Sequence, residues 1–162
     1  MDEKQSKLRQ ELASNLPHFT GTEEYHRLRY PWLRKDFLLT DGAKYLADKA
    51  GVIGGTAYWL IDIIASHQLN KKVAAQSFQT WRLYVNHVQA GEPDPERPRP
   101  TTVLAWKQRA QPNEALVTCD DGNGQILVTQ EIPFADFALD EVNLYLTNDD
   151  VNGIVVMLPS EY

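Results

Sequence analysis

The chain has 162 residues, of which 43% are hydrophobic and 23% are charged, as expected for a single globular domain of ordinary composition. No run of eighteen apolar residues occurs, which excludes a transmembrane helix of the usual kind, and the opening MDEKQSKLRQELAS is too polar for a secretory signal peptide. Its one cysteine, Cys119, cannot form an internal disulfide. These features predict a cytoplasmic protein.

The net charge of -6 is distributed very unevenly along the chain. The last basic residue is Arg109, and residues 110–162 carry ten acids without a single Lys or Arg, which leaves +4 for residues 1–109 against -10 for the remainder. Such asymmetry is explained by a basic partner for the acidic half, an anionic partner for the basic half, or neutralisation of one half by the other on folding. We favour neutralisation within the fold.

The N-terminal segment predicts a helical arm over residues 1–17, followed by a single α+β domain over residues 18–162. The arm has one narrow apolar stripe at helical spacing and ends at a proline, so it is expected to pack weakly or fray; the residues concerned are Leu8, Leu12, Leu16 and Pro17. Thr20 and Glu23 then have the spacing of a capping box, which predicts a short helix that ends before Pro31.

The stretch from Tyr25 to Lys35, YHRLRYPWLRK, combines bases with aromatic residues in an otherwise acidic protein. Its bases are Arg27, Arg29, Arg34 and Lys35, and its aromatic residues are Tyr25, Tyr30 and Trp32. Basic side chains that contact phosphates, next to aromatic rings that stack on nucleobases, are typical of proteins that bind single-stranded nucleic acid. An overall pI of about 5.2 argues against nucleic acid as the favoured partner. We expect at least two of the four bases to be paired with carboxylates of the fold.

Two helices follow. LTDGAKYLADKAG predicts the first, with Thr40 or Asp41 as its cap, Gly51 as its terminator and one buried face of Ala43, Leu46, Ala47 and Ala50. AYWLIDIIASHQL predicts the second, which is apolar over most of its circumference. Only Tyr58, Asp62 and Ser66 form a polar line, and this line is expected to face water or a partner.

The remainder of the chain predicts mainly strands. FQTWRLYVNHV alternates as a half-buried strand, TVLAWKQ is a second candidate, ALVTC and QILVTQEI flank the hairpin turn DDGNG, and GIVVMLP is the last strand. FALDEVNLYL fits a helix or a strand, and we prefer the helix. A Pro-rich loop at 89–101 joins the first two strands. The prediction is therefore an α+β fold with N-terminal helices packed on a four- to five-stranded antiparallel sheet.

Several phrases resemble a family of small uncharacterised bacterial proteins, a domain of unknown function found in cyanobacteria among others. They are FTGTEEY, LTDGAKYLADKAG, AYWLIDIIASHQ, LVTQEIPF, DFALDEVNLYL and MLPSEY. The similarity runs from about residue 19 to residue 162 and departs from the family pattern at VIGGT, at the Pro-rich loop and at RLRYPWLRK. The resemblance implies a compact α+β domain, and it transfers no activity and no catalytic residue.

No motif of an established catalytic, nucleotide-binding or metal-binding class occurs, and the four histidines are scattered, so we predict no cofactor and no metal. The function we favour is that of a non-enzymatic binding or accessory protein that engages a protein partner, as a regulator or as an inhibitor with an acidic C-terminal surface. Its candidate partner-binding residues are Arg27, Arg29, Trp32, Arg34, Lys35, Tyr58, Asp62 and Ser66. A second copy of the chain is a further candidate partner. The alternative is a small enzyme with a dispersed site around Asp62, His67 and the Thr40–Asp41 turn.

Overall fold

A computed structural model of the chain describes residues 3–87 and 101–162. The α-helices are α1 (Glu3–Asn15), α2 (Asp41–Lys49), α3 (Tyr58–His67), α4 (Lys71–Ala74) and α5 (Thr101–Arg109). The strands are β1 (His26–Leu28), β2 (Phe37–Leu39), β3 (Phe78–Val85), β4 (Ala115–Asp120), β5 (Ile126–Ile132), β6 (Glu141–Asp149) and β7 (Gly153–Met157). The described residues also contain three 3₁₀ turns, η1 (Leu16–His18), η2 (Val52–Gly54) and η3 (Pro159–Glu161). Within the described ranges, no helix has both the length and the apolar character needed to cross a membrane.

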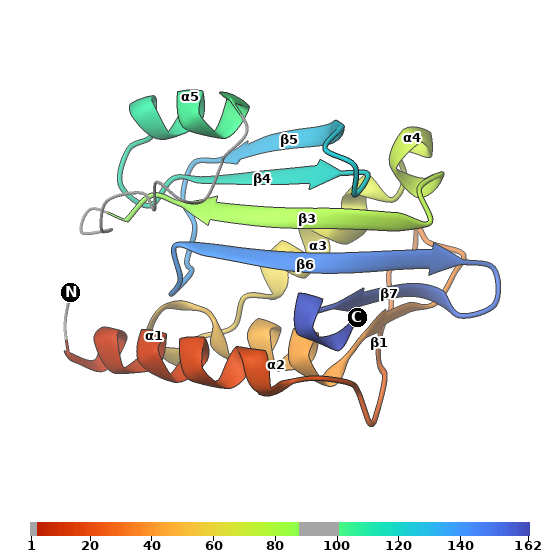
Figure 1. Cartoon of the computed structure of the whole chain (residues 1–162), viewed down its shortest axis with the longest axis horizontal. Coiled ribbons are helices and arrows are strands. Elements are labelled where there is room, and N and C mark those ends of the chain that lie inside the picture. The colour runs from red at the N-terminus through yellow and green to blue at the C-terminus, as the bar shows by residue number, and fades with distance from the viewer. Residues whose placement is uncertain (1–2, 88–100) are drawn as a thin grey trace.

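The strands form one mixed sheet in the order β1-β2-β7-β6-β3-β4-β5 (Figure 1). Neighbouring strands are antiparallel except for β2 and β7, which run parallel with Phe37 opposite Ile154 and Leu39 opposite Val156. The predicted α+β class is thus confirmed, but the sheet is larger than the four or five strands expected and is not all antiparallel. The missing strands, β1 and β2, have three residues each, too few to show a period of two in the sequence.

Two segments form a different type of secondary structure from the one predicted. The segment FALDEVNLYL contributes most of β6 instead of a helix, because Val142, Leu144 and Leu146 alternate at a period of two and all face the core. The segment TVLAWKQ lies in α5 instead of a strand, because its two buried residues, Val103 and Trp106, are three positions apart.

The short helix expected from Thr20 and Glu23 is also absent, since β1 and an irregular approach occupy this part of the chain. The polar groups here bind the start of α2 rather than cap a helix of their own. The backbone N–H of Glu23 donates to the Asp41 carboxylate at 2.9 Å, and the Thr22 hydroxyl accepts from the Asp41 N–H at 2.9 Å.

The main core lies between one face of the sheet and α2 and α3 (Figure 1). The predicted buried face of α2 is correct, and Thr40 caps this helix by accepting a hydrogen bond from the N–H of Ala43. The N-terminal helix α1 joins the same core through the fully buried Leu12, so the arm packs more firmly than its narrow stripe suggested.

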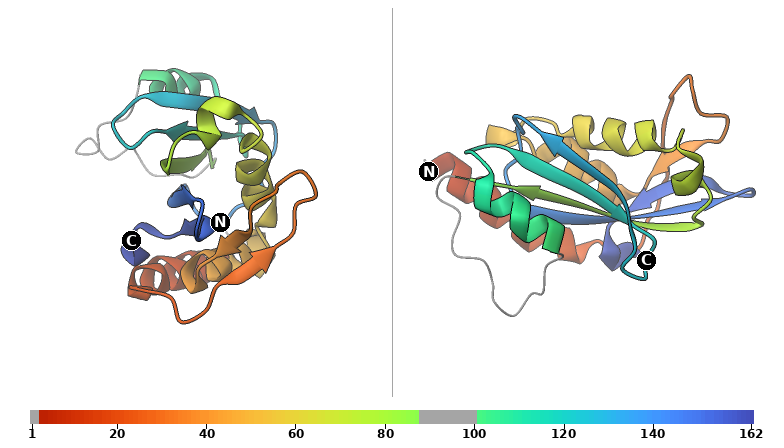
Figure 2. Two further views of the ribbon diagram at one scale, coloured as in Figure 1. Left: turned by 90° about the vertical axis from the view of Figure 1, so that its right-hand side faces the viewer. Right: turned by 90° about the horizontal axis from the view of Figure 1, so that it is seen from above.

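A second, smaller core lies on the opposite face of the sheet, beneath α5 (Figure 2). It consists of Tyr84, Val103, Trp106 and Leu116. The expectation that β3 is half-buried is therefore wrong, because α5 covers the face that Tyr84 occupies. Residues 89–100 of the predicted Pro-rich loop lie outside the described residues.

Candidate functional site

The last two residues of β1 and the connection from β1 to β2, which together we call the basic loop (residues 27–36), stand out from the end of the sheet (Figure 2). A β-turn shapes its centre, with the N–H of Leu33 donating to the carbonyl of Tyr30 at 3.0 Å. Pro31 occupies the second position of this turn, where its fixed φ is favourable. The proline predicted to end a helix instead forms a tight reversal of the chain.

Two aromatic side chains hold the basic loop against α3. The Tyr30 hydroxyl donates to Asp62 at 2.6 Å, and the Trp32 indole N–H donates to the carbonyl of Ala65 at 3.2 Å. Burial, together with the hydrogen bond to Asp62, raises the pKa of Tyr30 well above its ordinary value, so the hydroxyl remains a donor across the physiological range. The ring of Tyr30 also packs edge-on against Phe37 of β2, with the ring centroids 5.1 Å apart.

Two of the four bases in the basic loop have acidic partners, as the sequence predicted. Arg27 pairs with Asp36 at 3.0 Å. Lys35 pairs with Asp150 at 3.1 Å and donates to the side-chain oxygen of Asn148 at 2.8 Å. Both acids lie outside the main core, and the side chain of Asp150 is 98% exposed, so these are surface ion pairs of small individual energy.

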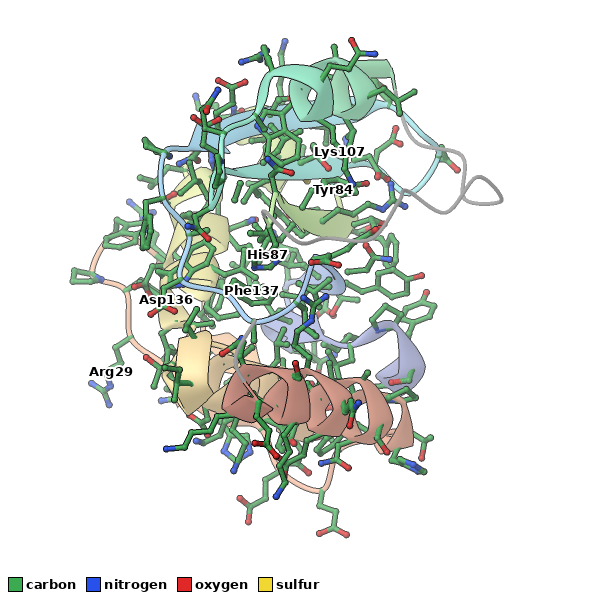
Figure 3. The ribbon with its side chains drawn as sticks, turned by 90° about the vertical axis from the view of Figure 1, so that its left-hand side faces the viewer. Arg29, Tyr84, His87, Lys107, Asp136 and Phe137 are labelled. Carbon is green, nitrogen blue, oxygen red and sulfur yellow. The ribbon has the colours of Figure 1, made fainter. Side chains whose placement is uncertain are left out.

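The other two bases, Arg29 and Arg34, are exposed and form no ion pair or hydrogen bond with the residues that the structure describes. Figure 3 shows Arg29 extending away from the ribbon into solvent. Both arginines line a surface pocket of about 420 Å³. Its lining residues are Arg27, Leu28, Arg29, Tyr30, Pro31, Leu33, Arg34, Lys35 and Asp36.

The remaining predicted residues, Tyr58, Asp62 and Ser66, form a polar line on α3. The structure brings part of this line to the basic loop. Asp62 receives the hydrogen bond of Tyr30. Tyr58 instead donates to Asp48 of α2 at 2.6 Å, and the Ser66 hydroxyl donates to the carbonyl of Ile63 at 2.6 Å. Tyr58 therefore joins α3 to α2 and the Ser66 hydroxyl bonds within its own helix, whereas Asp62 contacts the basic loop directly.

Sequence reasoning missed the residues that position this surface. Tyr30 was recognised only as an aromatic residue, although its hydroxyl anchors the basic loop to α3. Asp36 and Asp150 were not recognised as partners of Arg27 and Lys35. Asp36 adjoins the bases in the sequence and could have been found by charge proximity. Asp150 is more than a hundred positions from Lys35, and no local signal connects them.

The residues of the alternative catalytic site have separate partners. Asp62 bonds to Tyr30, whereas a ring nitrogen of His67 lies 2.6 Å from the side-chain oxygen of Gln130 in β5. Asp41 bonds to His26 at 2.8 Å. In the described parts of the chain, no group of three or more His, Cys, Asp or Glu side chains is placed to hold a metal ion.

Cys119 is fully buried in β4, where burial and then the neighbouring Asp120 raise the pKa of its thiol to about 12. A thiol with so high a pKa is protonated at neutral pH and is a poor nucleophile. This agrees with the small hydrophobic role that a lone cysteine in a strand usually has.

Among the residues that the structure describes, ion pairs between arginine or lysine and a carboxylate join the basic and acidic halves at four places. These pairs are Arg9–Asp140, Lys35–Asp150, Arg82–Asp120 and Arg109–Glu131. Most of the other acids of the second half bind polar groups nearby; Asp121, for example, accepts from the N–H of Asn123 at 2.8 Å. The fold itself thus neutralises part of the asymmetry, as we expected from the sequence.

The comparison with known protein families settles the relationship of this chain. A family model described as a family of unknown function (DUF6876) matches residues 10–162, which cover both cores and the basic loop. The chain belongs to this family. The expectation that the chain belongs to a family of unknown function is thereby confirmed. No curated protein and no solved structure matches the chain. The description of the family names no activity and no partner.

Proposed function

We propose that this member of the family is a non-enzymatic binding protein that engages a protein partner through the basic loop. The contact surface consists of the exposed bases of the loop, the indole of Trp32, and Asp62 and Ser66 of α3. The partner presents an acidic surface to the two unpaired arginines. We further propose that the protein acts in the cytoplasm, because a chain with a single cysteine needs no oxidising compartment to form an internal disulfide.

The observation that carries this proposal is a pair of arginines, without a partner in the described part of the chain, beside a half-exposed tryptophan. Trp32 is 42% exposed, and Arg29 and Arg34 flank it in the chain. Tryptophan, tyrosine and arginine are the residues most often found at the energetic centres of protein interfaces. The bonds of Tyr30 and Trp32 to α3 hold the loop in one conformation, which lowers the entropy cost of binding.

Two other functions have less support. An acidic C-terminal surface that mimics a polyanion needs free carboxylates, but Asp120, Asp140 and Asp150 already have basic partners within the chain. A dispersed catalytic site needs Asp62 and His67 to converge, and they bond to different elements. The basic loop combines exposed arginines that have no partner among the described residues with an exposed aromatic side chain.

A charge-reversal variant tests the proposal. The purified chain is immobilised and used to capture proteins from a lysate of its native host at low and at high salt. A partner of the basic loop binds the wild type, is lost with Arg29→Glu/Arg34→Glu, and is weakened by salt. The matched control is Lys71→Glu/Lys72→Glu on α4, which reverses the same number of exposed charges away from the loop.

The outcomes separate the candidates. Loss of a captured protein with the loop variant but not with the α4 variant supports the proposal. Equal capture by both variants would overturn it, as would capture of a second copy of the chain alone, which light scattering of the purified protein would reveal as a concentration-dependent mass.

A further inference from the structure

We infer that the pocket of the basic loop binds a phosphate monoester, carried by a phosphorylated side chain of the protein partner. This inference rests on the proposed function, because it specifies what the partner presents to the loop. Clusters of arginines are the usual means by which proteins recognise phosphorylated segments. The chemical class of the ligand is thus a dianionic phosphoryl group on serine, threonine or tyrosine.

The charge of the pocket is the first argument. Its lining includes Arg27, Arg29, Arg34 and Lys35 but only one carboxylate, that of Asp36, so the formal charge of the lining is +3. The whole chain carries -6. A positive concave site on an acidic protein concentrates a small anion locally, whereas the rest of the surface repels an extended one.

The state of the cations is the second argument. Arg29 and Arg34 have no partner to give up among the described residues, and each guanidinium can offer two parallel N–H groups to a phosphoryl oxygen pair. Arg27 and Lys35 are held by exposed contacts: Arg27 by its pair with Asp36, whose side chains are 54% and 56% exposed, and Lys35 by its pair with Asp150 and its hydrogen bond to Asn148. Pairs of this kind contribute little, so both cations are able to turn toward a stronger anion.

The choice of a phosphate monoester over other anions follows from charge and size. A monoester carries close to two negative charges at neutral pH and three acceptor oxygens, against one charge and two oxygens for a carboxylate. A pocket of about 420 Å³ is within the range of small-ligand sites and has room for a phosphoryl group together with the side chain that carries it. Nucleic acid binding relies on a row of phosphate contacts along a basic stripe, and a pI of about 5.2 disfavours it.

Three short probes with one neutral sequence test the inference: a peptide with phosphoserine, the same peptide with serine, and the same peptide with glutamate. A single-stranded oligonucleotide is the fourth probe. Binding to the whole protein is measured by calorimetry, and NMR shifts of backbone amides locate the contact. We expect the phosphopeptide to bind about tenfold more tightly than the serine and glutamate peptides, with shifts confined to the basic loop.

Variants decide whether the pocket is responsible. Arg29→Ala/Arg34→Ala is expected to weaken phosphopeptide binding about tenfold or more, while Lys71→Ala/Lys72→Ala leaves it within about twofold. Both pairs are exposed, and an unchanged amide spectrum outside the loop establishes that each variant is folded. Equal affinity for the phosphorylated and unphosphorylated peptides, tighter binding of the oligonucleotide, or no effect of the arginine variant would each overturn the inference.

Phosphatase treatment of the lysate in the capture experiment separates this inference from the proposed function. If a protein that depends on Arg29 and Arg34 is lost after phosphatase treatment, both stand. If it is still captured after treatment, the basic loop binds a partner but the phosphate inference is wrong. If no captured protein depends on the two arginines, the proposed function fails, whatever the peptides show.

Discussion

Asp140 ties two distant segments of the chain to the start of β6. One carboxylate oxygen pairs with Arg9 of α1 at 2.8 Å, and the other lies 2.6 Å from a ring nitrogen of His87. The second ring nitrogen of His87 lies 2.9 Å from the carbonyl of Phe137, and Figure 3 shows these two residues side by side. Both ring nitrogens of His87 therefore lie within hydrogen-bonding distance of an oxygen.

These contacts make stability depend on pH in a definite direction. The hydrogen bond with His87, followed by the charge of Arg9, lowers the pKa of Asp140 against the opposing effect of burial. Because its pKa is lower in the folded state, Asp140 stabilises the fold fully above the unfolded value of about 4. This contribution is lost as the pH falls through the lowered value of the folded state.

Asp140→Asn is therefore expected to lower the free energy of unfolding by about 1 kcal/mol at pH 7, a figure reduced for solvent screening because the side chain is 38% exposed. The deficit should shrink as the pH approaches 3. Urea unfolding followed by tryptophan fluorescence at several pH values measures it. Glu114→Gln is the control, since Glu114 has no side-chain partner among the described residues. A deficit that stays constant with pH would contradict the assignment.

At the scale of elements, the C-terminal turn η3 caps helix α2. The Glu161 carboxylate accepts from the Thr40 hydroxyl at 2.6 Å and from the backbone N–H groups of Gly42 and Leu158, each at 3.0 Å. A carboxylate at this position satisfies an orphan N–H of the helix and interacts favourably with its dipole. The last residues of the chain thus fix the first turn of a core helix.

Gly42→Ala tests this packing because two effects oppose each other. In an exposed helix, alanine is better than glycine by about 1 kcal/mol. Here a Cβ at residue 42 would press against the Glu161 carboxylate and lie 2.6 Å from a methyl carbon of Leu158. We expect the free energy of unfolding to fall by about 1–3 kcal/mol in thermal or urea unfolding.

The matched control for this substitution is Gly21→Ala, where a Cβ would have no neighbour within 4 Å. It should leave the unfolding midpoint almost unchanged. If Gly42→Ala stabilised the protein instead, the close contact between η3 and α2 would be ruled out.

At the scale of the whole molecule, the sheet separates two hydrophobic cores of unequal size. The main core lies beneath α2 and α3, and the smaller one holds α5 to the other face through Trp106, Tyr84 and Leu116. Only the larger core joins elements from both ends of the chain. Helix α5 is therefore expected to open independently of the sheet, as a local unit of low stability.

Trp106→Ala tests this separation. Trp106 is 2% exposed, and its removal should lower the free energy of unfolding by about 2–4 kcal/mol. Amide hydrogen exchange should show lost protection in α5 while β3 and β6 remain protected. Leu104→Ala on the same helix, where the side chain is 45% exposed, should change neither quantity measurably. Equal loss of protection in α5 and β3 would show that the two cores unfold together.

The features of the fold and the site that the sequence predicted are those set by residues close together in the chain. The buried face and the cap of α2, the hairpin of β4 and β5, and the concentration of bases in the basic loop were all read correctly, because each follows from spacings of a few residues. The predicted secondary structure was wrong for the segments that form α5 and β6. Their segments are short and apolar enough to fit either structure, and only the sheet they join or cover decides between them.

The sequence by itself determined the α+β class, the two main helices, the charge asymmetry and the family, since these depend on composition and local pattern. Tertiary structure alone decided that β2 runs parallel beside β7, that Lys35 pairs with Asp150, and that Tyr30 anchors the basic loop to α3. It also decided that Arg29 and Arg34 have no partner within residues 3–87 and 101–162. The physical reason is distance along the chain. Segments a hundred or more residues apart can form ion pairs and strand pairings, and these contacts leave no periodic pattern in either segment.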